Sequence, residues 1–133
     1  MNMDERFGKA YKLCSQVKIE QLFEQKKTIK KYPLTIHYLI TEDNIEKPFQ
    51  IVISAPKKIF RKAHERNRIK RLMKETFRKN KLTLERFLNQ EQKKVYLFLV
   101  YTSNEELDYK ILMKKTKQLI ELVIKQIKEN ETH

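Results

Sequence analysis

Glycine is almost absent from this chain: Gly8 is the single glycine among 133 residues, and there is no tryptophan. The phosphate-binding loops G-x-G-x-x-G and the P-loop need several glycines and are therefore excluded. The single cysteine, Cys14, rules out an internal disulfide and offers no cysteine set for a structural zinc ion. We expect no metal ligands among the side chains and a reducing, cytoplasmic location.

Long hydrophobic runs are also missing. The longest, Val95 to Tyr101, is far shorter than the roughly 20 residues of a membrane-spanning helix. The N-terminal residues MNMDERFGKAYKL lack the apolar segment of a secretory signal. We therefore expect no membrane partner. The length and the 40% hydrophobic content predict a single folded domain over residues 1–133.

Acidic residues are scarce in one segment, residues 57–81, which reads KKIFRKAHERNRIKRLMKETFRKNK. The segment holds 12 of the 30 Lys and Arg residues but 2 of the 17 Asp and Glu residues, so it carries +10 of the formal net charge of +13. The rest of the chain is nearly balanced. Charge of one sign concentrated in this way is typical of a surface that binds a polyanion.

Hydrophobic periodicity predicts an α+β sandwich in which helices pack on a small mixed sheet, in the order α-β-β-α-β-α. Ser15 is placed to cap the first helix, and the Tyr32-Pro33 step should keep the chain extended. A hairpin loop is expected between the first two strands, and continuous apolar character suggests that the third strand is central. The expected elements are a helix at about 16–26, strands at 34–40 and 49–54, a helix at about 61–79, a strand at 95–101 and a helix at about 105–128.

The ends of the two long helices are predicted from polar residues. Asn80 could end the basic helix, with another turn or two over residues 84–89. Glu105 and Glu106 would start the C-terminal helix, where the helix dipole favours negative charge.

The basic segment separates into two faces when residues 61–78 are placed on a helix of about 100° per residue. The apolar stripe consists of Ile69, Leu72, Met73 and Phe77. The opposite face, which we call the basic arc, consists of Asn67, Lys70, Arg71, Lys74 and Arg78, with Arg68 at its flank. A charged outer face is usually only solvated, but such faces normally mix both signs. This arc contains no acid, which favours a bound anion.

Arg66 lies at the edge of the apolar stripe, at the first turn of the predicted helix. It could hold the start of the helix in place, or it could reach into a neighbouring groove. Its long side chain could also simply extend to solvent along the apolar surface. The sequence leaves these alternatives open.

The run KAHERNRIKRLMKETFR, residues 62–78, resembles the R-N-R signature of the bacterial ribonuclease P protein subunit. The likeness extends over essentially the whole chain, including Arg6-Phe7, Phe23 and Pro56-Lys57-Lys58, although the R-N-R helix is its specific part. The resemblance implies a protein that assists a catalytic RNA in removing the 5′ leader from precursor tRNA. It further implies Mg²⁺ bound in the RNA-containing holoenzyme, and a left-handed crossover through the basic helix, against the general right-handed preference.

The resemblance also implies two sets of site residues. The residues that would face the catalytic RNA are Lys62, Arg66, Asn67, Arg68, Lys70, Arg71, Lys74 and Arg78. The residues that would line the cleft for the leader are Ile19, Phe23, His37 and Lys58. Aromatic side chains in such a cleft stack on unpaired bases of any sequence. Phe23 could equally be a core residue, because it shares helical spacing with Ile19, and a lone His37 on a strand is more often structural.

Two other functions remain open. A ribosomal or other structured-RNA-binding protein would use the same basic helix to contact phosphates. A self-sufficient metal-dependent nuclease would need clustered carboxylates or histidines to hold Mg²⁺ or Mn²⁺, and the acids here are dispersed. A helix-turn-helix DNA-binding protein is disfavoured because a strand precedes the basic helix.

Overall fold

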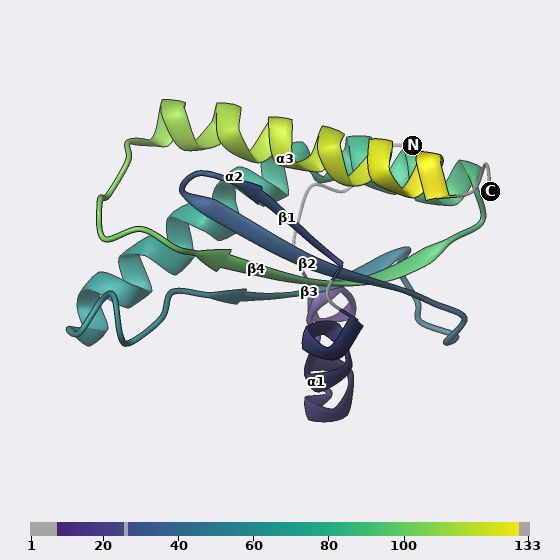
Figure 1. Ribbon diagram of the computed structural model, residues 1–133, viewed down its shortest axis with the longest axis horizontal. Coiled ribbons are helices and arrows are strands. Elements are labelled where there is room, and N and C mark those ends of the chain that lie inside the picture. The colour runs from purple at the N-terminus through teal and green to yellow at the C-terminus, as the bar shows by residue number, and fades with distance from the viewer. Residues whose placement is uncertain (1–7, 26, 131–133) are drawn as a thin grey trace.

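The computed structural model describes residues 8–25 and 27–130, and it has the α+β architecture expected from the sequence. Helices α2 and α3 cover one face of a four-stranded sheet, and α1 lies against the other face (Figure 1). The elements are a 3-10 turn η1 (Lys9–Tyr11), α1 (Gln16–Gln25), β1 (Thr28–Lys31), β2 (Leu34–Thr41), β3 (Phe49–Ser54), α2 (Ala63–Gln90), β4 (Lys94–Tyr101) and α3 (Tyr109–Asn130).

The strand order is β1-β2-β4-β3. Strand β4 is central, as its continuous apolar character predicted, and it pairs antiparallel with β2 and parallel with β3. The predicted hairpin between β2 and β3 is wrong, because β4 lies between them. The hairpin in the structure joins β2 to β1, a strand that the sequence pattern did not reveal. The Tyr32-Pro33 step, expected to be extended, forms its turn and has a cis peptide bond.

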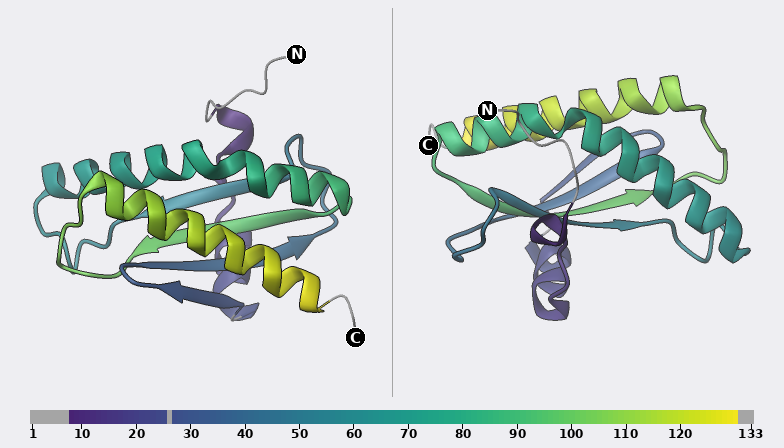
Figure 2. Two further views of the ribbon diagram at one scale, coloured as in Figure 1. Left: turned by 90° about the horizontal axis from the view of Figure 1, so that it is seen from above. Right: turned by 180° about the vertical axis from the view of Figure 1, so that it is seen from behind.

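Parallel strands β3 and β4 are joined by α2, which crosses above the sheet. Figure 2 (left) shows the sheet from the helix side. When this view is turned so that β3 and β4 both point upward, β4 lies to the left of β3. The crossover is therefore left-handed, as the resemblance implied, and it departs from the general preference for right-handed connections. This topology places the start of α2 next to the end of β3, at the edge of the sheet.

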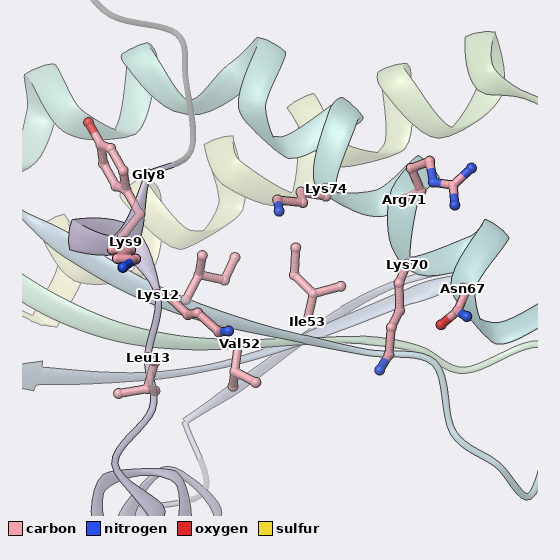
Figure 3. A pocket seen from close by; sticks show the side chains of 12 residues that line it. Gly8, Lys9, Lys12, Leu13, Val52, Ile53, Asn67, Lys70, Arg71 and Lys74 are labelled. Atoms are coloured by element: carbon pink, nitrogen blue, oxygen red, sulfur yellow. The ribbon is translucent and has the colours of Figure 1, made fainter. Parts of the chain in front are cut away.

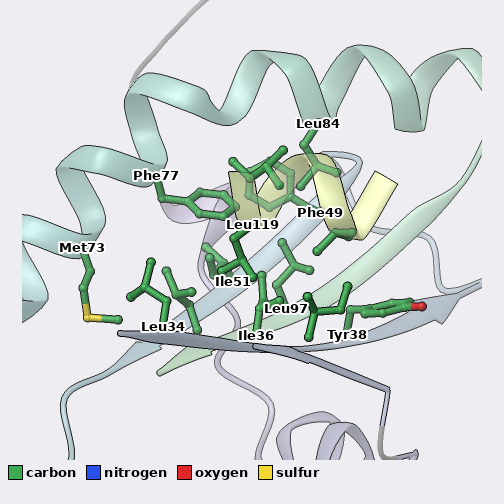
Figure 4. Close-up of a cluster of buried hydrophobic side chains, with 14 of the residues drawn as sticks. Leu34, Ile36, Tyr38, Phe49, Ile51, Met73, Phe77, Leu84, Leu97 and Leu119 are labelled. Carbon is green, nitrogen blue, oxygen red and sulfur yellow. The ribbon is translucent and has the colours of Figure 1, made fainter. Parts of the chain in front are cut away.

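The main core lies between the sheet and the two long helices (Figure 4). Alternation along the strands supplies one layer, for example Ile36 and Leu97, which are fully buried. The predicted apolar stripe of α2 supplies the facing layer: Ile69, Met73 and Phe77 are fully buried, and Leu72 is partly buried against them. These helical contacts leave the basic arc on the outside.

Helix α2 continues to Gln90, so the predicted end at Asn80 is wrong. The side-chain amide of Asn80 donates to the carbonyl of Thr76 within the continuing helix, at 2.8 Å. Lys81 interrupts the apolar period because it occupies the core-facing position, and it is fully buried. Its ammonium donates to the Tyr11 hydroxyl and to Glu85, each at 3.2 Å, so the helix tolerates a charge at this position.

Helix α3 begins at Tyr109, four residues later than predicted, because the Asp108 side chain accepts from the backbone N–H of Ile111 at 2.9 Å. Glu105 and Glu106 therefore do not act on a helix dipole. Glu105 accepts a hydrogen bond from the Tyr32 hydroxyl at 3.1 Å. Glu106 forms an ion pair with Arg68 of α2.

Candidate nucleic-acid interface

The basic arc is exposed along the first half of α2. Asn67, Lys70, Arg71 and Lys74 all present exposed side chains, as does Lys62 immediately before the helix. Within the described residues, none of the four cations Lys62, Lys70, Arg71 and Lys74 forms an ion pair or a side-chain hydrogen bond. Their charges are therefore available to an external anion, with cations on successive turns of one rigid helix.

Arg66 holds the start of α2 in place, one of the alternatives left open by the sequence. One of its guanidinium nitrogens donates to the backbone carbonyls of Phe60 and Arg61, at 2.9 and 3.0 Å. These bonds tie the helix to the segment that leads into it, and the side chain is only partly exposed. Arg66 thus positions the basic arc, and part of its donor capacity is already used.

Two further arginines of the predicted RNA face pair with acids. Arg68 forms a two-point ion pair with Glu106, at 2.8 and 2.7 Å. Arg78 donates to Glu75 one turn earlier along α2, so an acid does reach the basic arc, contrary to the expectation from the helical projection. Half-exposed pairs of this kind contribute about 0–1 kcal/mol, so a phosphate could replace either acid at small cost.

The exposed cations of α2 form one wall of a groove of about 730 Å³. Lys70 and Lys74 extend from α2 toward β3, where Ile53 points to the helix side and Val52 to the α1 side (Figure 3). The opposite wall is the N-terminal segment Gly8–Leu13. The groove therefore joins the N-terminal segment to β3 and to the first half of α2.

On the other face of the sheet, polar contacts fix α1 in place. Ser15 caps the helix as predicted, accepting from the backbone N–H of Lys18 at 3.3 Å. Asp43 accepts from Lys18 at 3.0 Å and from the Tyr96 hydroxyl at 2.7 Å. Desolvation and the hydrogen bond to Asp43 raise the pKa of Tyr96 to about 12. The loop after β2 thereby joins α1 to the central strand.

Beside this anchored helix, three rings form an aromatic cluster: Phe23, His37 and Phe98. The Phe23 ring lies 5.1 Å from that of His37 and 4.9 Å from that of Phe98, centroid to centroid. His37 and Phe98 are partners in the β2–β4 ladder. Phe23 is 49% exposed, so it is not a plain core residue. Ile19 packs partly buried in the adjoining small core under α1.

The surroundings of His37 favour its neutral form. Burial, with the charge of Lys30, lowers the pKa of His37 below its ordinary value of 6.5. Its Nδ1 shares a 2.8 Å hydrogen bond with the Thr28 hydroxyl. The ring is therefore fixed in orientation, and its half-buried face belongs to the aromatic cluster.

Lys58 lies apart from the aromatic cluster. It is exposed and lines a second hollow, of about 800 Å³, together with Tyr32 and Arg61. This hollow lies where β4 leaves the sheet, at the turn between β1 and β2. The structure thus brings together Phe23 and His37 with Ile19 nearby, but it places Lys58 in a different hollow.

Sequence reasoning missed three residues of these surfaces. Phe98 was assigned only to the buried central strand, although alternation along that strand directs it to the α1 side. Lys9 and Lys12 stand outside the dense basic segment, and no local pattern connects them to α2. They reach the groove because the N-terminal segment bridges to Ile51 on β3.

Within residues 8–25 and 27–130, no three His, Cys, Asp or Glu side chains come close enough together to hold a metal ion. Among the helices described, none has the apolar length that a bilayer crossing requires.

Known proteins resemble this chain in both sequence and fold. A profile of the Ribonuclease P family matches residues 7–123. The ribonuclease P protein component of Porphyromonas gingivalis is 30% identical over 112 residues, covering 83% of this chain and 82% of the relative. That of Haemophilus influenzae is 36% identical over 72 residues, covering 54% of this chain and 58% of the relative.

Solved structures agree with the architecture. The ribonuclease P protein of Staphylococcus aureus superposes with a TM-score of 0.65 at 13% identity, covering 86% of this chain and 96% of the other. The protein of Thermotoga maritima also gives 0.65, at 18% identity, covering 82% and 94%. At such identities these two comparisons establish the fold, whereas the match along most of the sequence establishes the relationship. The chain belongs to the family of ribonuclease P protein components.

Proposed function

We propose that this protein is the RNA-binding subunit of ribonuclease P, and that it assists a catalytic RNA in removing the 5′ leader from precursor tRNA. The observation that carries the proposal is the row of exposed cations on α2: Lys70, Arg71 and Lys74. The opposite side of this helix is buried in the core, so the row faces outward in a protein that belongs to the ribonuclease P protein family. Phosphate contacts from such a row supply affinity without reading sequence. Arg68 and Arg78 add to the row when they exchange their acids for phosphates.

The leader is proposed to bind on the other face of the sheet, at the aromatic cluster. Phe23 presents a half-exposed ring whose orientation is set by its contacts with His37 and Phe98. Stacking on such a ring accepts any base, which suits a leader of variable sequence. Ile19 supports α1 beneath the cluster, and Lys58 would contact the substrate backbone from the second hollow.

The protein's role in the reaction is to bind and orient RNA. Mg²⁺ bound in the RNA-containing holoenzyme would supply the metal chemistry of phosphodiester hydrolysis. The cations of α2 would lower the repulsion between the two RNAs, and thereby the Mg²⁺ concentration that the complex needs. The predicted partners are the catalytic RNA and precursor tRNA.

Reconstitution with the host's catalytic RNA tests the proposal, with leader removal scored at low Mg²⁺. We expect the protein to restore cleavage where the RNA alone is inactive, and Arg71→Glu/Lys74→Glu to lose most of this effect. Lys114→Glu/Lys117→Glu, the same change of charge at exposed sites on α3, is the matched control. Equal cleavage with and without protein would contradict the proposal. Cosedimentation with ribosomes would instead favour a ribosomal role.

A further inference from the structure

We propose that the groove between α2 and the N-terminal segment binds a single, non-helical strand of RNA, with Lys9 and Lys12 contacting its phosphates from the side opposite α2. This inference rests on the proposed function, because it takes RNA as the ligand of α2. It assigns a role to two residues outside the basic helix. It also specifies the form of RNA that this surface takes.

The charge of the groove is of one sign. Twelve residues of the described ranges 8–25 and 27–130 line it; none of these twelve is an acid, and five are cations: Lys9, Lys12, Lys70, Arg71 and Lys74. The walls come from segments about 60 residues apart in the sequence (Figure 3). Like charges brought face to face repel each other, so an anion between them is stabilised by both walls.

The shape of the groove favours a strand over a duplex. Its volume of about 730 Å³ lies in the range of about 300–1,000 Å³ typical of pockets that enclose small ligands. Its aliphatic lining comes from the edge strand β3, with Ile51 and Ile53 on the helix side and Val52 on the α1 side, so the groove runs along that edge and can contact ribose and base surfaces. A single strand can lie on this lining with phosphates directed to both walls. A duplex is too wide to enter the groove, so its phosphates would contact the exposed cations of α2 but not the opposite wall.

The N-terminal wall is held in place before RNA arrives. The backbone N–H of Leu13 donates to the carbonyl of Ile51 at 3.0 Å. Tyr11 is buried, its ring 5.1 Å from that of Phe49, and the Lys81 ammonium lies 4.5 Å from the Tyr11 ring centre. These contacts anchor the segment that carries Lys9 and Lys12, whose own side chains are exposed. A preorganised wall binds its ligand with a smaller entropic cost.

Two fluorescein-labelled probes test the inference with the full chain: a 12-nucleotide oligouridylate and a 12-base-pair RNA duplex. Lys9→Glu/Lys12→Glu should lower the salt slope for oligouridylate by about 1.4, because each lost single-strand phosphate contact removes about 0.7. If affinities converge at 1 M salt, that slope corresponds to about a 25-fold loss at 0.1 M. Duplex affinity should change no more than in the control Lys114→Glu/Lys117→Glu. Circular dichroism establishes that each variant is folded.

The outcomes separate this inference from the proposed function. If Lys9→Glu/Lys12→Glu matches the control on oligouridylate while Arg71→Glu/Lys74→Glu loses affinity, the groove is refuted and the α2 interface stands. Equal losses on oligouridylate and duplex would also refute a strand-specific groove. If Arg71→Glu/Lys74→Glu matches the control on both probes, the α2 interface itself fails, and the groove with it.

Discussion

Replacing Phe23 by alanine should weaken binding of precursor tRNA while leaving mature tRNA almost unaffected. Phe23 is 49% exposed, and its ring contacts His37 and Phe98 at centroid distances of 5.1 and 4.9 Å. The ring is therefore available on one side and supported on the other. Mature tRNA lacks the leader, so it has no base to stack there.

The expected magnitudes follow from this geometry. Removing a buried Phe costs about 3–5 kcal/mol of stability, so a half-exposed one should cost about 2 kcal/mol, within the roughly 5–15 kcal/mol available to a domain. The variant should stay folded. Stacking on an aromatic side chain contributes about 1–3 kcal/mol per base, which corresponds to about a 5- to 150-fold loss of affinity for precursor tRNA.

The assay is equilibrium binding of precursor and mature tRNA to the reconstituted holoenzyme. Val17→Ala is a matched control, because Val17 is also on α1 and is 61% exposed. Phe23→Leu keeps an apolar side chain but removes the aromatic face, so it should lose most of the affinity that Phe23→Ala loses. Equal loss for both tRNAs would refute the reasoning, as would full recovery by Phe23→Leu.

Three further predictions concern residues that position the site. Arg66→Met should lower the free energy of unfolding by about 2–3 kcal/mol, because two charged hydrogen bonds to backbone carbonyls are lost; an unchanged urea midpoint would contradict this. Lys81→Met should accelerate amide hydrogen exchange at Leu13 without unfolding α2, because the Tyr11 contact is lost; unaltered exchange would show that Lys81 does not hold the N-terminal wall. The lowered pKa of His37 means that the unfolded state binds more protons, so stability is complete above pH 6.5 and decreases as pH falls through that value. His37→Gln should lack this decrease, as measured by urea unfolding at pH 7.5 and 5.0; a parallel decrease in both proteins would assign it to other groups.

Local hydrophobic periodicity was sufficient to predict most helices and strands and the position of the basic arc. Both faces of α2 follow from side-chain spacing, because a helix repeats every 3.6 residues whatever packs against it. The helix end was predicted wrongly where Lys81 breaks that period, and the contacts that compensate for it come from Tyr11, 70 residues away. The helical projection also failed to predict the contact between Glu75 and Arg78, since flexible side chains reach across the face of a helix.

Local sequence patterns did not predict which strands are neighbours in the sheet. Strands β2 and β3 alternate as a hairpin would, yet β4 lies between them, because strand order depends on which faces can be buried together.

The amino-acid sequence by itself determined a cationic helix with one buried face, because charge and periodicity are properties of contiguous residues. Only the tertiary structure decided that Lys9 and Lys12 face that helix across a groove, that Phe98 joins Phe23 and His37, and that Lys58 stands apart. Those relations depend on strand order and crossover, which are set by packing between residues far apart in the chain.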